Sequence, residues 1–255
     1  VFVDDVASIP PGANTVFSAH GVSNAVVAAA RARGLRVIDA TCPLVTKVHL
    51  QGQRYAKRGH TIVVVGHAGH EEVEGTTGSI DGPVHVVGTL EDVARLPMPR
   101  DAAVAYITQT TLSIDDTREL IDALEARYPA IVGPGLDDIC YATLNRQRST
   151  RTMARQVDVV LVVGARNSSN SNRLREVALQ QGVPSYLVQT ADDVDPAWLA
   201  GAGRVGVTAG ASAPEVLVQA VCARLREYGA RSVRELPGLA ETVKFRLPEA
   251  LQQSA

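Results

Sequence analysis

Histidines and carboxylates gather in one glycine-flanked segment, Gly66–Gly75, which directly follows the apolar stretch Thr61–Val65. A histidine can bind an anion or relay a proton, and a carboxylate beside it can act as a general acid if its pKa is raised. We therefore predict that His70 and Glu72 do proton chemistry. The alternatives are a solvated acidic helix start and a zinc site, and the His67-x-x-His70 spacing indicates zinc only weakly.

Small hydroxyl and amide side chains gather in a second segment, Ala165–Arg173, which follows the apolar stretch Asp158–Val163. Such side chains cap a following helix while the free N–H groups of its first turn face an anion. We predict that Ser168, Ser169 and Asn170 bind a phosphate or diphosphate. The alternative interpretation is a plain helix cap in a polar loop.

Three further strand ends carry polar side chains. His20 follows a short apolar run, Thr110 lies between another run and Ser113, and Ser212 comes shortly after a third. We interpret His20 as a ligand contact, Thr110 as a hydroxyl that orients substrate and Ser212 as a second phosphate donor. The alternatives are a structural histidine and simple helix capping by Ser113.

Two of the three cysteines stand in similar surroundings. Cys42 and Cys140 each follow an acidic residue closely and open a predicted helix, about one small domain apart along the chain. In repeated α/β units, such cysteines could converge on a shared centre; coincidence is the alternative. Cys222 differs, because it lies within an amphipathic helical pattern where a buried cysteine acts as a small apolar side chain.

Short β-branched runs alternate with helical patterns along the chain, which predicts βα units on parallel sheets. The expected strands are Thr15–Ala19, Arg36–Ala40, Thr61–Val65, Val84–Val87, Ala103–Thr108, Asp158–Val163, Ser185–Val188 and Arg204–Thr208. The expected helices are Val22–Arg33, Pro43–Arg58, Ile114–Arg127, Tyr141–Gln156, Asn170–Gln181 and Ala213–Tyr228. The net charge of −2 and the lack of an apolar run of membrane-spanning length predict no nucleic-acid or membrane partner.

Several sequence motifs together resemble those of one protein family, both in their residues and in their order along the chain. The chain resembles the LytB (IspH) family of hydroxymethylbutenyl diphosphate reductases, from about Val1 to Arg226. The strings that carry the resemblance are Ser18-Ala-His20-Gly21, Asp39-Ala-Thr-Cys42-Pro43, Gly66-His-Ala-Gly-His70-x-Glu72-Val-Glu-Gly75, Thr108-Gln-Thr110-Thr111, Asp137-Asp-Ile-Cys140-Tyr141 and Asn167-Ser-Ser-Asn-Ser-Asn172.

The resemblance implies an α/β fold of three small domains with parallel sheets, arranged as a trefoil around a central 4Fe–4S cluster. We expect residues 1–40 to be the remainder of an incomplete first domain, 41–136 the second, 137–228 the third and 229–255 a C-terminal tail. The implied reaction is a reductive dehydroxylation that gives isopentenyl and dimethylallyl diphosphates in the methylerythritol phosphate route. The implied electron donor is a ferredoxin or flavodoxin, and the expected location is the bacterial cytoplasm.

The resemblance also assigns roles to individual residues. Cys42 and Cys140 would be cluster ligands, and Glu72 would deliver a proton to the leaving hydroxyl with the help of His70 and Thr110. The residues that would hold the diphosphate substrate are His20, His70, Thr110, Ser168, Ser169, Asn170 and Ser212.

Two family strings have no counterpart between Val1 and Ala255: Gly-Phe-Cys-x-Gly, which carries the family's first cysteine, and His-Glu-x-Val-His. We therefore expect the chain to enter the family's first domain part-way, so that targeting cannot be assessed from it. We also expect Val1–Ala255 alone not to hold a stable 4Fe–4S cluster, because such clusters usually take three or four thiolates. A cluster-free phosphate-binding protein without activity is the alternative function.

Overall fold

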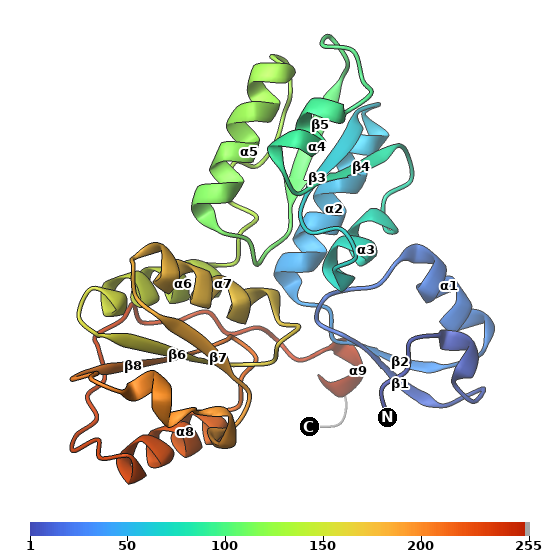
Figure 1. The fold of residues 1–255 in the computed structure, drawn as a ribbon. Coiled ribbons are helices and arrows are strands. Elements are labelled where there is room, and N and C mark those ends of the chain that lie inside the picture. Colours follow the sequence, from blue (N-terminus) through green and yellow to red (C-terminus); the bar gives the residue numbers. More distant parts are fainter. Residues whose placement is uncertain (253–255) are drawn as a thin grey trace. The chain divides into compact units, whose positions relative to one another are not determined.

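The computed structural model describes residues 1–252. These residues form three separate parallel sheets, with helices packed against them (Figure 1). The chain divides into two compact units. The first unit comprises residues 1–110, 114–138 and the segment from 243 onward, and the second comprises residues 111–113 and 139–242. The first unit therefore holds two of the sheets, and the second unit holds the third.

The smallest sheet pairs strands β1 (Asn14–Phe17) and β2 (Arg36–Asp39), which are joined through helix α1 (Asn24–Ala32). Ser23 caps α1 by accepting a hydrogen bond from the Val26 N–H. A small apolar cluster that includes Phe17 packs at this sheet, whereas the neighbouring Val16 is 62% exposed.

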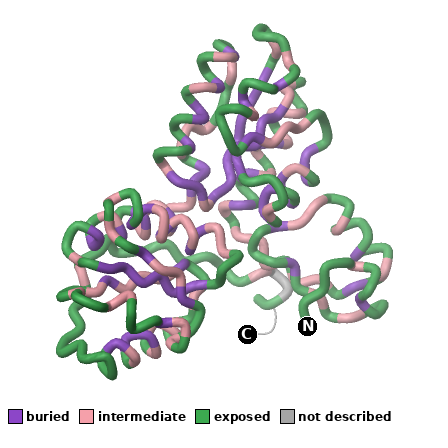
Figure 2. The backbone as a smooth tube through the Cα atoms, viewed as in Figure 1, coloured by how far each residue is buried: buried purple, intermediate pink, exposed green. Residues whose placement is uncertain are grey.

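The second sheet has the strand order β4-β3-β5. Ile62 and Val64 of β3 pack with Val48 and Val73 from two helices, and the alternate side chains of β3 are buried as well. Figure 2 colours the buried residues of the chain purple, those of β3 among them. The elements of this part are α2 (Pro43–Lys57), β3 (Thr61–Val65), α3 (Glu71–Thr77), β4 (Val84–Val87), α4 (Leu90–Arg95), β5 (Val104–Thr108) and α5 (Ile114–Arg127).

The third sheet has the order β7-β6-β8. Leu161 of β6 packs with Val221 and Leu225 of α8, while Val160 and Val162 pack with α6 and α7 on the other face. Its elements are α6 (Tyr141–Ala154), β6 (Val159–Val163), α7 (Ser169–Gln180), β7 (Ser185–Val188), β8 (Val205–Ala209) and α8 (Glu215–Glu227), with short α9 (Glu249–Gln252) near the end of the chain. Three 3₁₀ turns lie at Val6–Ser8, Ala191–Asp193 and Pro196–Leu199.

The α/β class with parallel sheets is confirmed, and each expected strand and helix is present with ends shifted by at most two residues. The prediction missed three short helices of the described residues, α3, α4 and α9. The segment Gly66–Gly75 is helical from Glu71 onward, not a loop throughout. Three glutamates stand in this first turn, where negative charge is favourable, and His70 caps it.

Candidate functional site

A buried carboxyl group lies where β5 ends against the start of α3. Glu72 is 2% exposed. Its Oε1 accepts a hydrogen bond from the Thr110 backbone N–H at 2.6 Å, and its Oε2 accepts one from the Thr110 hydroxyl at 3.0 Å. Burial raises the pKa of Glu72, while the two Thr110 hydrogen bonds and nearby His20 oppose the rise. Burial therefore shifts Glu72 towards the protonated form relative to an exposed glutamate, and the two Thr110 hydrogen bonds hold its carboxyl group in one orientation.

His70 caps the helix that carries this carboxyl. Its Nδ1 accepts a hydrogen bond from the Glu72 backbone N–H at 3.1 Å, so Nδ1 carries no proton and Nε2 is the donor of the neutral ring. Burial lowers the pKa of His70, repulsion from His20 and His67 lowers it further, and Glu71 opposes them. The structure thus fixes His70 as a neutral Nε2–H donor.

His20 lies beside His70, as the interpretation of both as ligand contacts requires. The two rings meet edge to face with centroids 5.5 Å apart. The His20 Nδ1 is 2.9 Å from the Glu71 carboxylate, a pair that is exposed to solvent. Glu71 was not among the predicted site residues, although its position between His70 and Glu72 could have marked it as a partner for a nearby histidine.

Gly75 of α3 and Gly78, which directly follows that helix, let the His20 loop approach it closely. A Cβ atom at Gly75 would lie 2.8 Å from the Gly21 carbonyl oxygen, and one at Gly78 would lie 2.3 Å from the Ser23 Cβ. The Asn24 N–H donates to the Gly78 carbonyl oxygen at 2.9 Å and closes the contact. Gly21 also has φ +77°, which favours glycine. These backbone contacts hold His20 near the first turn of α3.

A second group of predicted residues gathers in the second unit, at the start of α7. Ser168 caps this helix by accepting a hydrogen bond from the Ser171 N–H, and Ser169 receives one from the Thr111 hydroxyl at 3.1 Å. Asn170 is 6% exposed, and within the described residues neither polar atom of its amide has a hydrogen-bond partner. Buried polar atoms without partners are costly, so this amide is poised to bind a ligand.

The loop of Ser212 approaches the same helix start. A Cβ atom at Gly210 would lie 2.2 Å from the Ser171 hydroxyl oxygen and 3.5 Å from the Asn170 amide nitrogen. Ser212 follows two residues later and is exposed, and Pro214, not Ser212, precedes α8. The structure therefore brings the ends of β6 and β8 together around neutral donors.

Cys42 and Cys140 occupy equivalent positions, each in a different unit. Each immediately precedes a helix, with φ −57° and ψ 131° for Cys42 and φ −58° and ψ 132° for Cys140. Both thiols are free and half-buried, and in the described part of the chain neither caps its helix. Each cysteine is therefore available as a candidate metal ligand. Cys222 is buried in α8, and burial raises the pKa of its thiol.

Two cysteines alone fall short of a cluster site. Among residues 1–252, no three His, Cys, Asp or Glu side chains come together as a metal-binding group. This finding gives no support to the zinc interpretation of His70 and Glu72. It also means that the present residues fit an iron–sulfur cluster as two separate thiolate donors, not as a complete ligand set.

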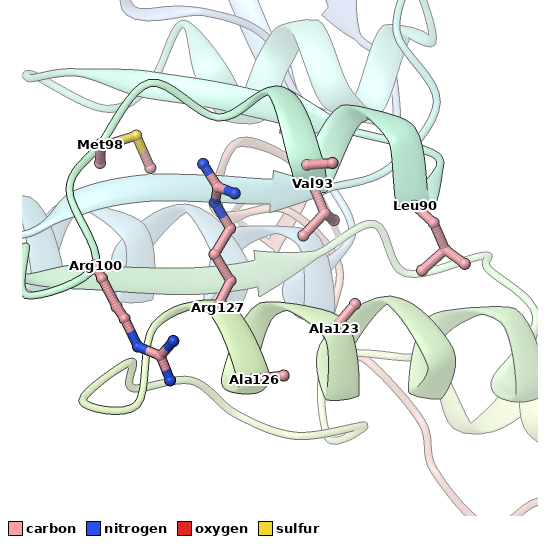
Figure 3. Close-up of a pocket in the computed structure, with 8 residues that line it drawn as sticks. Leu90, Val93, Met98, Arg100, Ala123, Ala126 and Arg127 are labelled. Atoms are coloured by element: carbon pink, nitrogen blue, oxygen red, sulfur yellow. The ribbon is translucent and has the colours of Figure 1, made fainter.

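A shallow groove of about 590 Å³ lies between α4 and α5 and contains none of the predicted site residues (Figure 3). Leu90, Met98 and Ala123 line it together with Arg100 and Arg127.

Within the described residues, no helix has the length and apolar character needed to span a membrane.

Comparisons with known proteins agree with the motif analysis. The family described as LytB protein matches residues 1–226. The 4-hydroxy-3-methylbut-2-enyl diphosphate reductase of Zymomonas mobilis is 55% identical over 252 residues, which cover 99% of this chain and 74% of that protein. The reductase of Aromatoleum aromaticum is 58% identical, with 99% and 81% covered.

A solved structure extends the likeness to the fold. The structure titled as the E-1-hydroxy-2-methyl-but-2-enyl-4-diphosphate reductase from Plasmodium falciparum matches with a TM-score of 0.91 and 32% identity, over all of this chain and 80% of that one. A second structure, of (E)-4-hydroxy-3-methyl-but-2-enyl diphosphate reductase, matches with a TM-score of 0.58 and 33% identity over 88% of this chain and 79% of that one.

Proposed function

The chain belongs to the LytB family of 4-hydroxy-3-methylbut-2-enyl diphosphate reductases, and from that membership we propose which residues carry the reaction. The protein is an oxidoreductase of isoprenoid biosynthesis that reduces this allylic diphosphate. The reaction breaks the bond between carbon and the hydroxyl oxygen, consumes two electrons and two protons, and releases water. Isopentenyl and dimethylallyl diphosphates are the proposed products.

Glu72 is the proposed proton donor. The observation that carries this assignment is its buried carboxyl group, oriented by two hydrogen bonds from Thr110 and held towards the protonated form. Hydroxide is a poor leaving group, so a proton must reach the oxygen as the bond to carbon breaks. A carboxyl group whose pKa is raised can deliver that proton at neutral pH.

The diphosphate is proposed to bind through neutral donors and imidazoles. Ser168, Ser169, Asn170 and Ser212 supply hydroxyl and amide groups near the N-terminus of α7, where free backbone N–H groups favour an anion. His20 and the His70 Nε2–H supply further donors.

Cys42 and Cys140 are the proposed thiolate ligands of the family's 4Fe–4S cluster. When bound, the cluster supplies electrons and an open iron that acts as a Lewis acid. With only these two cysteines at helix starts and Cys222 buried in α8, residues 1–255 are expected to bind less than a full cluster. A ferredoxin or flavodoxin as donor, a location in the bacterial cytoplasm and the division at residues 40, 136 and 228 are carried over from the family resemblance.

Anaerobic reconstitution tests these assignments. We expect residues 1–255 with iron and sulfide to give fewer than four irons per chain, and a chain preceded by the family's Gly-Phe-Cys-x-Gly segment, called here the completed reductase, to give about four. With dithionite-reduced methyl viologen and substrate, the completed reductase should form isopentenyl and dimethylallyl diphosphates, identified by mass spectrometry. A fully loaded protein that left the substrate unchanged would contradict the proposed function.

A further inference from the structure

A lysine on α2 reaches the chain segment that leads to Cys140. The Lys47 ammonium group donates a hydrogen bond to the Asp137 carbonyl oxygen at 2.9 Å, and it lies 3.2 Å from the Asp138 Oδ1. Lys47 is in the second turn of the helix that begins directly after Cys42. One side chain therefore links the first cysteine-bearing helix to the residues just before the second cysteine.

Asp138 is an unusual partner, because its side chain is fully buried whereas the Lys47 side chain is 46% exposed. A buried carboxylate without a compensating charge is costly, and loss of one member of such a pair is more costly than loss of a surface pair. The Asp138 Oδ2 also faces the Thr108 N–H at 3.4 Å. Lys47 and Thr108 thus hold Asp138 between α2 and the end of β5.

The residues before Asp138, from 132 to 135, also form hydrogen bonds with β5. The Tyr106 N–H donates to the Val132 carbonyl oxygen at 2.9 Å, and the Tyr106 hydroxyl accepts a hydrogen bond from the Gly135 N–H at 3.2 Å. A Cβ atom at Gly133 would lie 2.3 Å from the Tyr106 ring. The segment from 132 to 138 is therefore held against β5 within the first unit, and the Lys47–Asp138 pair holds its final residue.

Directly after Asp138 the chain passes into the second unit, and Cys140 immediately precedes α6. We propose that Lys47 and Asp138 form a positioning pair that fixes the chain immediately before the cysteine ligand Cys140. This inference rests on the proposed function, because that function makes Cys140 a ligand. Neither member of the pair needs to touch substrate.

Hydrogen exchange on residues 1–255 tests the pair without any cluster. Lys47→Met should raise amide exchange in residues 133–141 at least about tenfold while exchange in β3 stays unchanged. Lys57→Met, on the last turn of the same helix, is the matched control and should change neither region. Unchanged exchange in 133–141, or an equal rise in β3 that reports general destabilisation, would overturn the proposal.

Thiol alkylation gives a second readout that is specific to the positioned residue. Iodoacetamide should modify Cys140 at a changed rate in Lys47→Met, with Cys42 and Cys222 unaffected, and Lys47→Arg should restore most of the original rate. Equal changes at all three thiols would overturn the positioning role. If the completed reductase bound no iron at all, the proposed function would fail, while the exchange and alkylation results would still decide the positioning pair.

Discussion

The two groups of proposed site residues differ in the chemistry of their side chains. At the start of α3, Glu72, His70 and His20 are all titratable, and burial shifts the pKa values of the first two towards their neutral forms. At the start of α7, Ser168 to Asn170 cannot titrate near neutral pH and instead offer hydroxyl and amide donors. The contrast separates a titratable region, proposed to hold the proton on Glu72 and to add imidazole donors for the anion, from a region of neutral donors proposed to hold the anion.

The largest effect should come from removal of the proton. Glu72→Gln keeps the shape of the side chain but removes its acid, so turnover of the completed reductase should fall by at least about 10². Its diphosphate affinity should stay within about twofold if the two regions have separate tasks.

The matched control is Glu74→Gln, on the same helix but exposed, which should leave turnover near that of the parent. Steady-state assays at equal iron content compare the variants. Normal turnover by Glu72→Gln with an unchanged cluster spectrum would remove Glu72 from the mechanism.

The second region should show the opposite pattern, with binding lost and stability kept. Asn170→Ala removes a buried amide that has no hydrogen-bond partner among the described residues, so diphosphate affinity should fall by about 1.5–3 kcal/mol, as for loss of a hydrogen bond to a charged group. The melting temperature of the free protein should fall less than this loss of affinity would suggest, because the substitution also removes a buried amide that is costly to leave without a partner.

Calorimetry with inorganic diphosphate measures the affinity, and Asn145→Ala on α6 is the control. Ser169→Ala should weaken binding by a similar amount. Parental affinity in both Asn170→Ala and Ser169→Ala would place the anion elsewhere.

The raised pKa of Glu72 should also make the free energy of unfolding depend on pH. The folded pKa of Glu72 lies above its ordinary value of 4.5, so the stabilisation of the protonated form is complete below pH 4.5 and is lost as pH rises through the folded pKa. Each unit of that rise costs the ionised folded state about 1.4 kcal/mol.

Urea denaturation from pH 4 to 8 should therefore show Glu72→Gln gaining stability over the parent as the pH increases. A difference that does not change with pH would indicate an unshifted carboxyl group.

The smallest effect concerns the cap of α3. His70→Asn keeps a good capping side chain, so the free energy of unfolding at pH 7.5 should change by less than about 1 kcal/mol. The lowered pKa of His70 gives stability that is present above pH 6.5 and lost as pH falls through the folded pKa.

Thermal melts should therefore show a weaker acid-side loss in His70→Asn than in the parent. Diphosphate affinity should fall, because the Nε2–H donor is gone. An identical acid-side slope would show that His70 does not titrate between the folded and unfolded states.

Local patterns predicted most of the fold, because β-branched runs and helical periodicity are read from neighbouring residues. They also predicted the α7 start, where Ser168 caps the helix three residues ahead of Ser171. The Glu72–Thr110 contact joins residues from different elements, and only the family resemblance brought them together. Lys47–Asp138 was missed entirely, since nothing near Lys47 in sequence marks a buried acid in a distant segment.

The central claim is that burial raises the pKa of Glu72 above its ordinary value and so suits this carboxyl group to the proposed role of proton donor. ¹³C NMR of residues 1–255 labelled at glutamate side-chain carboxyl carbons measures this directly, with Glu72→Gln used to assign the resonance. We predict a Glu72 carboxyl resonance whose pKa lies above 4.5 and which is absent from the spectrum of Glu72→Gln. A Glu72 resonance that titrates at or below 4.5 would contradict it.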